Sequence, residues 1–196
     1  MSSYFSLACL AQIESAYFPE YDNLYCKYSV VYGSDWTVIS GVEEGITQLG
    51  KASTSISFSA SNSTTKEIPP GRVCVWNFPL EIAFKSTNAY GWPQIVFNVY
   101  GLDSFGRDVI RGYGSLRLPL SSGQYEKFVP TFIPVASVPL NGFIAYLAGR
   151  LPEFLDSRFV VKNEGREVTR VKSQGTVKVK LNIITKDLEN FGYINK

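Results

Sequence analysis

The sequence has no histidine among its 196 residues, and this absence excludes several kinds of chemistry at once. Without an imidazole, the chain cannot build a Ser-His-Asp or Cys-His nucleophile pair, an imidazole general base or a histidine-containing zinc site. Paired acids such as Glu43-Glu44 or Asp103 with Asp108 could in principle do acid–base work. The sequence places no nucleophile or base beside them, so we predict no catalytic residue, no metal and no cofactor.

Cysteine is scarce as well, with only Cys9, Cys26 and Cys74. Their number is odd and their wide spacing forms no C-x-x-C pair, so we interpret them as reduced, buried thiols of a cytosolic protein. No apolar run approaches the ~20 residues that cross a bilayer. The apolar start lacks the preceding basic residue of a secretory signal, and we predict that residues 4–14 form the first strand instead.

Aromatic residues, by contrast, are plentiful at 14%, and they occur in segments that alternate between apolar and polar positions. In residues 76–85, one face carries Trp76, Phe78, Leu80, Ile82 and Phe84. Pro79 within this run indicates an edge strand or a bulge. The same alternation marks residues 26–32 and 177–183, and shorter candidates are residues 36–39, 94–102, 109–118, 124–133 and 166–172. The pattern predicts an all-β, antiparallel β-sandwich of about eight or nine strands.

Two segments break this rhythm within what we predict to be a single domain over residues 1–196. Residues 50–71 are rich in Ser and Thr and end in Pro-Pro-Gly, so we expect a long exposed loop, with residues 55–59 as a candidate short strand within it. Residues 141–154 place Phe143, Ile144 and Leu147 at helical spacing, which predicts one short helix there.

Charge is unevenly distributed behind a net value of +2. Residues 1–50 hold one basic residue against six acids, whereas residues 150–186 hold nine basic residues and four acids. Either the two regions neutralise each other in the fold, or they form two charged docking faces. With a pI near 8.3 and scattered basic residues, the chain lacks the concentrated patch of a nucleic-acid-binding protein, so we expect no nucleic acid as a partner.

The basic segment near the C-terminus is a candidate binding face. Its members are Arg166, Arg170, Lys172, Lys178 and Lys180. Lys178 and Lys180 alternate with apolar residues, so one strand face would carry both. Such a face attracts anionic lipid by ~1 kcal/mol per lysine, or it contacts an acidic partner. The alternative is that the lysines only solubilise the face or protect an edge from aggregation.

A Tyr-Gly-Trp-Pro motif at residues 90–93 is the second candidate site. Tyr and Trp are enriched in interaction hot spots, but they are also ordinary core residues, so the motif is either a protein interface or a packed turn. For Trp92 we predict a protruding ring that contacts a partner, and we place Tyr90 in the same candidate interface.

One stretch, Val99-Tyr-Gly-Leu-Asp103 followed by Asp108-Val-Ile, resembles the third-loop motif of C2-type domains, which cradles calcium. Gly101 stands where the first aspartate belongs. The partner loop of those domains would fall near residues 87–94, which carry no acid. The resemblance therefore implies a C2-like sandwich without calcium. The two aspartates are better explained by a turn, in which Asp side chains bond the nearby backbone.

Longer motifs in the same order along the chain resemble the B9 domain family. They are residues 18–28, 75–79, 84–95, 111–114 and 165–175. The resemblance implies a non-enzymatic structural or adaptor component of the ciliary transition zone, in the Meckel-syndrome (tectonic-like) complex on the cytoplasmic side of the cilium base. It also implies sibling B9-domain proteins and other members of that complex as partners, and a part in controlling membrane-protein entry. The loop at residues 50–71 departs from the family pattern and looks like an insertion.

Overall fold

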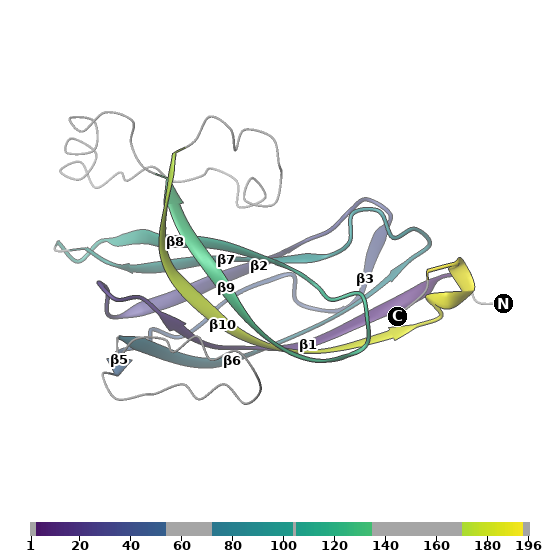
Figure 1. Ribbon diagram of the computed structural model, residues 1–196, viewed down its shortest axis with the longest axis horizontal. Helices are drawn as coiled ribbons and strands as arrows, with labels where there is room; N and C mark the ends of the chain where they lie inside the picture. Colours follow the sequence, from purple (N-terminus) through teal and green to yellow (C-terminus); the bar gives the residue numbers. More distant parts are fainter. Residues whose placement is uncertain (1–2, 54–71, 104, 135–169, 194–196) are drawn as a thin grey trace.

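The computed structural model describes residues 3–53, 72–103, 105–134 and 170–193, and these residues form an antiparallel β-sheet (Figure 1). The order of its strands is β3-β6-β1-β10-β9-β8-β7-β2-β4, and β5 pairs with β6 beside this path. The strands are β1 (Phe5–Tyr17), β2 (Leu24–Val31), β3 (Trp36–Gly41), β4 (Glu44–Ile46), β5 (Ala52–Ser53), β6 (Val73–Ser86), β7 (Gln94–Leu102), β8 (Asp108–Arg117), β9 (Gly123–Pro134) and β10 (Val171–Lys186).

This architecture confirms the predicted all-β antiparallel fold. The described residues contain ten strands where about eight or nine were expected for the chain, and β4 and β5, with three and two residues, are too short to leave an alternating pattern. Within the described ranges the helical content is one 3-10 turn, η3 (Glu189–Phe191). The short helix predicted for residues 141–154 lies outside the described residues.

The sheet curls over so that its two halves face each other. Strands β8 and β9 join the halves through one bridged pair, Tyr113 with Phe132. Across the interior, the Trp76 indole N–H on β6 donates to the carbonyl of Leu24 on β2 at 2.9 Å. The rings of Tyr32 and Phe84 meet edge to face at 5.2 Å. One hydrophobic core therefore holds both halves together, as in the sandwich that the pattern predicted.

The alternating segments bury the faces that were expected to be buried. In β10 the apolar residues from Val177 to Ile183 are buried, and in β6 Trp76, Leu80, Ile82 and Phe84 are buried. Phe78 is only partly buried. Asn77, just before it, has a left-handed φ of 47°, at a point where β6 carries one more residue than β1 opposite. The bulge expected near Pro79 is thus centred on Asn77.

Other expected segments differ in detail. The first residues of the predicted loop at residues 50–71 are not irregular, because Gly50 bridges to Leu24 and β5 pairs with β6. Residues 54–71, including the candidate strand at residues 55–59, lie outside the described residues. The separate strand expected at residues 166–172 is not separate, because Val171 and Lys172 begin β10; residues 166–169 are not among those described.

All three cysteines are free and buried, in accordance with their interpretation as core thiols. Burial raises the pKa of Cys9 to about 12, and burial also raises the pKa of Cys26 and Cys74. These thiols are therefore protonated and unreactive at neutral pH. In the described part of the chain, no helix has the length and apolar character needed to span a bilayer.

Candidate functional site

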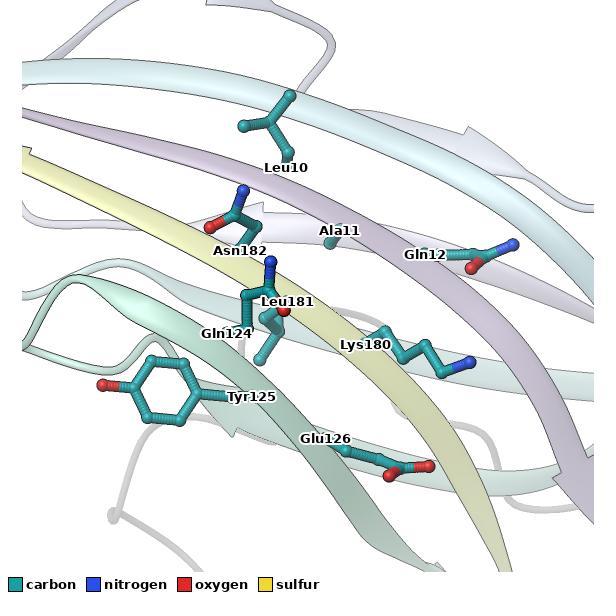
Figure 2. Close-up of a pocket in the computed structure, with 9 residues that line it drawn as sticks. All are labelled: Leu10, Ala11, Gln12, Gln124, Tyr125, Glu126, Lys180, Leu181 and Asn182. Carbon is teal, nitrogen blue, oxygen red and sulfur yellow. The ribbon is translucent and has the colours of Figure 1, made fainter. Parts of the chain in front are cut away.

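The outward face of strands β1, β10 and β9 forms a shallow hollow of about 500 Å³ (Figure 2). Strand register arranges its outward side chains in two rows across the three strands. One row is Leu10, Asn182 and Gln124, and the next is Gln12, Lys180 and Glu126. Their neighbours Ala11, Leu181 and Tyr125 point to the opposite, core side, because successive residues of a strand alternate between faces.

An ion-pair network borders this hollow. The Nζ atom of Lys178 lies 2.8 Å from Glu14 and 2.6 Å from Glu126, and that of Lys180 lies 2.7 Å from Glu14. Lys178 is nearly enclosed, with 12% of its side chain exposed, whereas Lys180 is 53% exposed. Two acids and two bases on three adjacent strands therefore compensate each other.

The pKa shifts follow from these contacts. Burial alone raises the pKa of Glu14, but hydrogen bonds and charge attraction from Lys178 and Lys180 together outweigh it, so the pKa lies below its usual value. Burial likewise lowers the pKa of Lys178, and its bonds to Glu126 and Glu14 more than reverse this, so the net shift is upward. The pair of Glu14 and Lys178 is therefore charged at neutral pH.

The predicted lysine face is only partly correct. Lys178 and Lys180 do share the outward face of β10, but Lys178 is enclosed by carboxylates and does not present a free charge. Self-neutralisation, one of the two charge alternatives, applies to Glu14, which belongs to the acidic first part of the chain and pairs with both lysines. Arg170 and Lys172 are exposed near the start of β10, and Arg166 lies outside the described residues.

The structure corrects the prediction for Trp92 and separates it from Tyr90. The Trp92 side chain is 2% exposed, its ring meets Trp36 edge to face at 5.0 Å, and its indole N–H donates to the Leu118 carbonyl at 3.0 Å. The expected protruding ring is wrong, because the turn directs Trp92 into the core. Tyr90 is 81% exposed and remains available to a partner.

The Asp103 carboxylate organises the turn between β7 and β8. It accepts hydrogen bonds from the backbone N–H of Phe105 and Arg107 at 2.8 and 2.9 Å, and from Arg107 Nε at 2.8 Å. Desolvation alone would raise the pKa of Asp103, but these bonds and the Arg107 charge outweigh it and lower that pKa. This is the turn that was preferred over a calcium site. Among the described residues, no three His, Cys, Asp or Glu side chains gather as metal ligands would.

The expected pairing of two C2-type loops is wrong in this chain. Residues 87–93 precede β7 and residues 103–107 follow it, so the nine-residue strand β7 holds the two loops at opposite ends of the sheet. At ~3.3 Å per residue, β7 separates them by roughly 30 Å.

Two residues of the network, Glu14 and Glu126, were not identified from the sequence. Each lies on the outward side of an alternating strand, which is an ordinary place for a solvated charge. The acidic first part and basic last part of the chain were the available signal, but the pattern contains no information on which acid meets which lysine.

Comparison with known proteins gives a match along nearly the whole chain. A family model described as "Ciliary basal body-associated, B9 protein" matches residues 7–184. Over 191 residues the chain is 52% identical to "B9 domain-containing protein 1" of Xenopus laevis, covering 97% of this chain and 89% of that protein. Identity to the Homo sapiens protein of the same name is 48%, with 97% and 87% covered.

More distant similarities extend the comparison. The chain is 28% identical to "B9 domain-containing protein 2" of Homo sapiens over 170 residues, covering 87% of each. Among solved structures, a C2 domain of plant Extended Synaptotagmin 1 is similar with a TM-score of 0.43 and 10% identity, covering 90% of this chain and 92% of that domain.

Proposed function

We propose that this chain, which belongs to the family of ciliary basal body-associated B9 proteins, is a non-catalytic adaptor that helps to assemble a protein complex at the base of the cilium. The family is one of structural proteins and not of enzymes, in accordance with the expectation drawn from the missing histidine. The observation that carries the proposal is identity of 48–52% to B9 domain-containing protein 1 across 97% of the chain.

The proposed complex is the Meckel-syndrome (tectonic-like) complex of the transition zone, on the cytoplasmic side. In this proposal residues 1–196 act as one B9 domain that binds sibling B9 proteins, and the assembled complex supports cilium formation and limits the entry of membrane proteins. The existence of B9 domain-containing protein 2 as a related sequence supports the idea of sibling partners. A surface whose charges are mutually compensated also suits protein contact, because a partner that covers it leaves each charge with its existing counter-charge.

A direct test uses the tagged chain in ciliated cells from which the endogenous protein has been removed. We expect the tagged chain to concentrate at the cilium base, to restore cilium number and to co-purify with the sibling B9 proteins. Diffuse localisation without rescue, or rescue without any co-purifying B9 protein, would contradict the adaptor role.

Peripheral binding to anionic lipid is the second candidate, supported by the exposure of Arg170, Lys172 and Lys180. The enclosure of Lys178 between two carboxylates weighs against it, because a paired lysine adds little attraction for lipid headgroups. A membrane role would therefore depend on the exposed basic residues alone.

A further inference from the structure

We infer that the hollow on the outward face of β1, β10 and β9 is the docking site for an extended, uncharged segment of a sibling B9 protein. The inference rests on the proposed function and deepens it, since it names the surface and the kind of segment that binds there. Three features of the described residues support it: charge compensation, the chemistry of the rows and their spacing.

Charge compensation determines which partners this surface can attract. Glu14 and Glu126 contribute two negative charges, Lys178 and Lys180 contribute two positive charges, and the ion pairs join all four. A surface that is neutral and internally paired steers neither an anion nor a cation toward itself. A lipid headgroup or a strongly charged peptide would compete with the existing ion pairs for Lys178 and Lys180, whereas an uncharged polypeptide segment would leave them intact.

The side chains between these charges match a polypeptide backbone. Gln12, Gln124 and Asn182 are amides, which carry both N–H donors and a carbonyl acceptor, as an extended backbone does; the Gln12 amide already donates one hydrogen bond to Asn77 Oδ1 at 3.4 Å. Apolar contacts lie on the same face, where Leu10 is 39% and Ile184 is 51% exposed. The face therefore offers hydrogen-bonding groups for a partner's backbone beside apolar groups for its side chains.

The spacing of the rows favours an extended occupant. Outward residues that follow one another on a strand, such as Leu10 and Gln12, are two positions apart and so lie about 7 Å apart. Alternate side chains of an extended partner segment have the same repeat. A segment that runs along β10 can therefore place its apolar side chains near Leu10 and Ile184 while its backbone meets the amides. Figure 2 shows the outward side chains of all three strands along this path.

The test measures the affinity of the purified chain for the purified sibling B9 domain-containing protein 2 of the same organism by calorimetry. Two variants, Leu10→Arg and Gln124→Arg, each place a positive charge in the hollow. Both positions are exposed, so neither substitution should disturb the core. The control is Leu49→Arg, which makes the same change at a residue that is 54% exposed beyond β4, in the other half of the sheet. We expect both hollow variants to bind at least tenfold more weakly, with Leu49→Arg within twofold of wild type and all melting temperatures unchanged.

A positional readout does not depend on how a variant folds. Since Cys9, Cys26 and Cys74 are buried, Asn182→Cys would carry the single accessible thiol among the described residues, to which a photo-cross-linker can be attached. We expect it to cross-link to an extended segment of the sibling protein, whereas the same probe on Leu49→Cys should not.

The outcomes separate this inference from the function on which it rests. If the wild-type chain does not bind the sibling protein, the partner assignment in the proposed function fails. If the wild type binds and both hollow variants bind equally well, the docking site is overturned while the adaptor role stands. Loss of binding in Leu49→Arg, with cross-linking from position 49 and none from position 182, would place the interface elsewhere and overturn the inference.

Discussion

Glu14 on β1 and Lys178 on β10 form a nearly enclosed ion pair of 2.8 Å, although 164 residues separate them in sequence. Lys178 also reaches Glu126 on β9, so one ammonium group joins three adjacent strands. Strands β1 and β10 come from the two ends of the chain, and their pairing completes the lower half of the sheet in Figure 1. The pair thus connects the ends of the chain at the border of the proposed docking site.

The first prediction concerns the unequal contributions of the two lysines. Replacing Lys178 by Met should lower the free energy of unfolding by about 1–3 kcal/mol, because Glu14 and Glu126 lose the ammonium group between them; Lys180 still pairs with Glu14, and the 36% exposed Glu126 is partly solvated. Replacing Lys180, which is half exposed, should cost no more than about 0.5 kcal/mol. Urea unfolding at pH 7 measures both, and equal losses in the two variants would show that enclosure of Lys178 has no energetic consequence.

The second prediction is the pH dependence of this pair. The pKa of Glu14 in the folded protein lies below its usual value of 4.5, so its stabilising contribution is fully present above that value and is lost as the pH falls through the folded pKa. The pKa of Lys178 is raised, and its contribution is lost only as the pH rises above 10.5. Both contributions are therefore complete at pH 7.

Glu14→Gln removes the acid-sensitive part of this stability. We expect the difference in unfolding free energy between the wild type and Glu14→Gln to be largest near pH 7 and to shrink steadily below pH 4.5. Urea titrations at intervals from pH 7 to about pH 3 measure it. A difference that stays constant over this range would mean that Glu14 titrates alike in the folded and unfolded states.

The third prediction assigns Trp92 to the core. Trp92→Ala should lower the unfolding free energy by about 3–5 kcal/mol, because it removes a buried ring and leaves the Leu118 carbonyl without its indole donor. A thermal melt measures the loss. If Trp92→Ala is as stable as the wild type but no longer binds the sibling protein, Trp92 is an interface residue and its assignment to the core is wrong.

Tyr90→Ala is the matched comparison within the same turn. Its side chain is exposed, and the Tyr90 carbonyl that accepts the Trp36 indole bond belongs to the backbone and is retained in the variant. We expect a melting temperature within a degree or two of wild type. Any decrease in binding to the sibling protein would then report a direct contact of the ring.

Sequence periodicity predicted strands such as β2 and β10 well because only one face of each is buried, which requires alternation. The predicted bounds of β7 also agree with the structure, although both of its faces are buried from Ile95 to Val99, so it forms a continuous buried run and does not alternate. Strand pairing is a different matter, because any outward acid could face any outward lysine until the register is known. The pairing of Glu14 with Lys178 depends on the register between β1 and β10, which periodicity does not contain.

The turn at Trp92 was mispredicted for a related reason. Alternation predicts direction within a strand, but a turn residue points where its backbone torsions direct it. Gly91, with a φ of 68°, lies against Gly33 so closely that a side chain there would clash, and this close approach turns Trp92 inward. Nothing in the sequence of residues 90–93 alone reveals a contact with a glycine so much earlier in the chain.

The last prediction separates the adaptor from the lipid-binding alternative. The full chain should remain at the bottom of a flotation gradient with phosphatidylserine vesicles at physiological ionic strength, because Lys178 is neutralised and the exposed Arg170, Lys172 and Lys180 are few. Attraction of ~1 kcal/mol for each basic residue near the surface totals only a few kcal/mol, and exposed charges are screened over ~8 Å at this ionic strength. The triple variant Arg170→Glu, Lys172→Glu and Lys180→Gln removes the exposed charges and the Lys180–Glu14 pair, adds no carboxylate beside Glu14, and retains Lys178 with its ion pairs to Glu14 and Glu126. The lipid role would be established, and this prediction contradicted, by three results together: the wild type floats, the folded triple variant does not, and flotation of the wild type decreases with added salt.

If the wild type does not float and does bind the sibling protein, the neutral outward face of β1, β10 and β9 is a surface for protein contact and not for lipid.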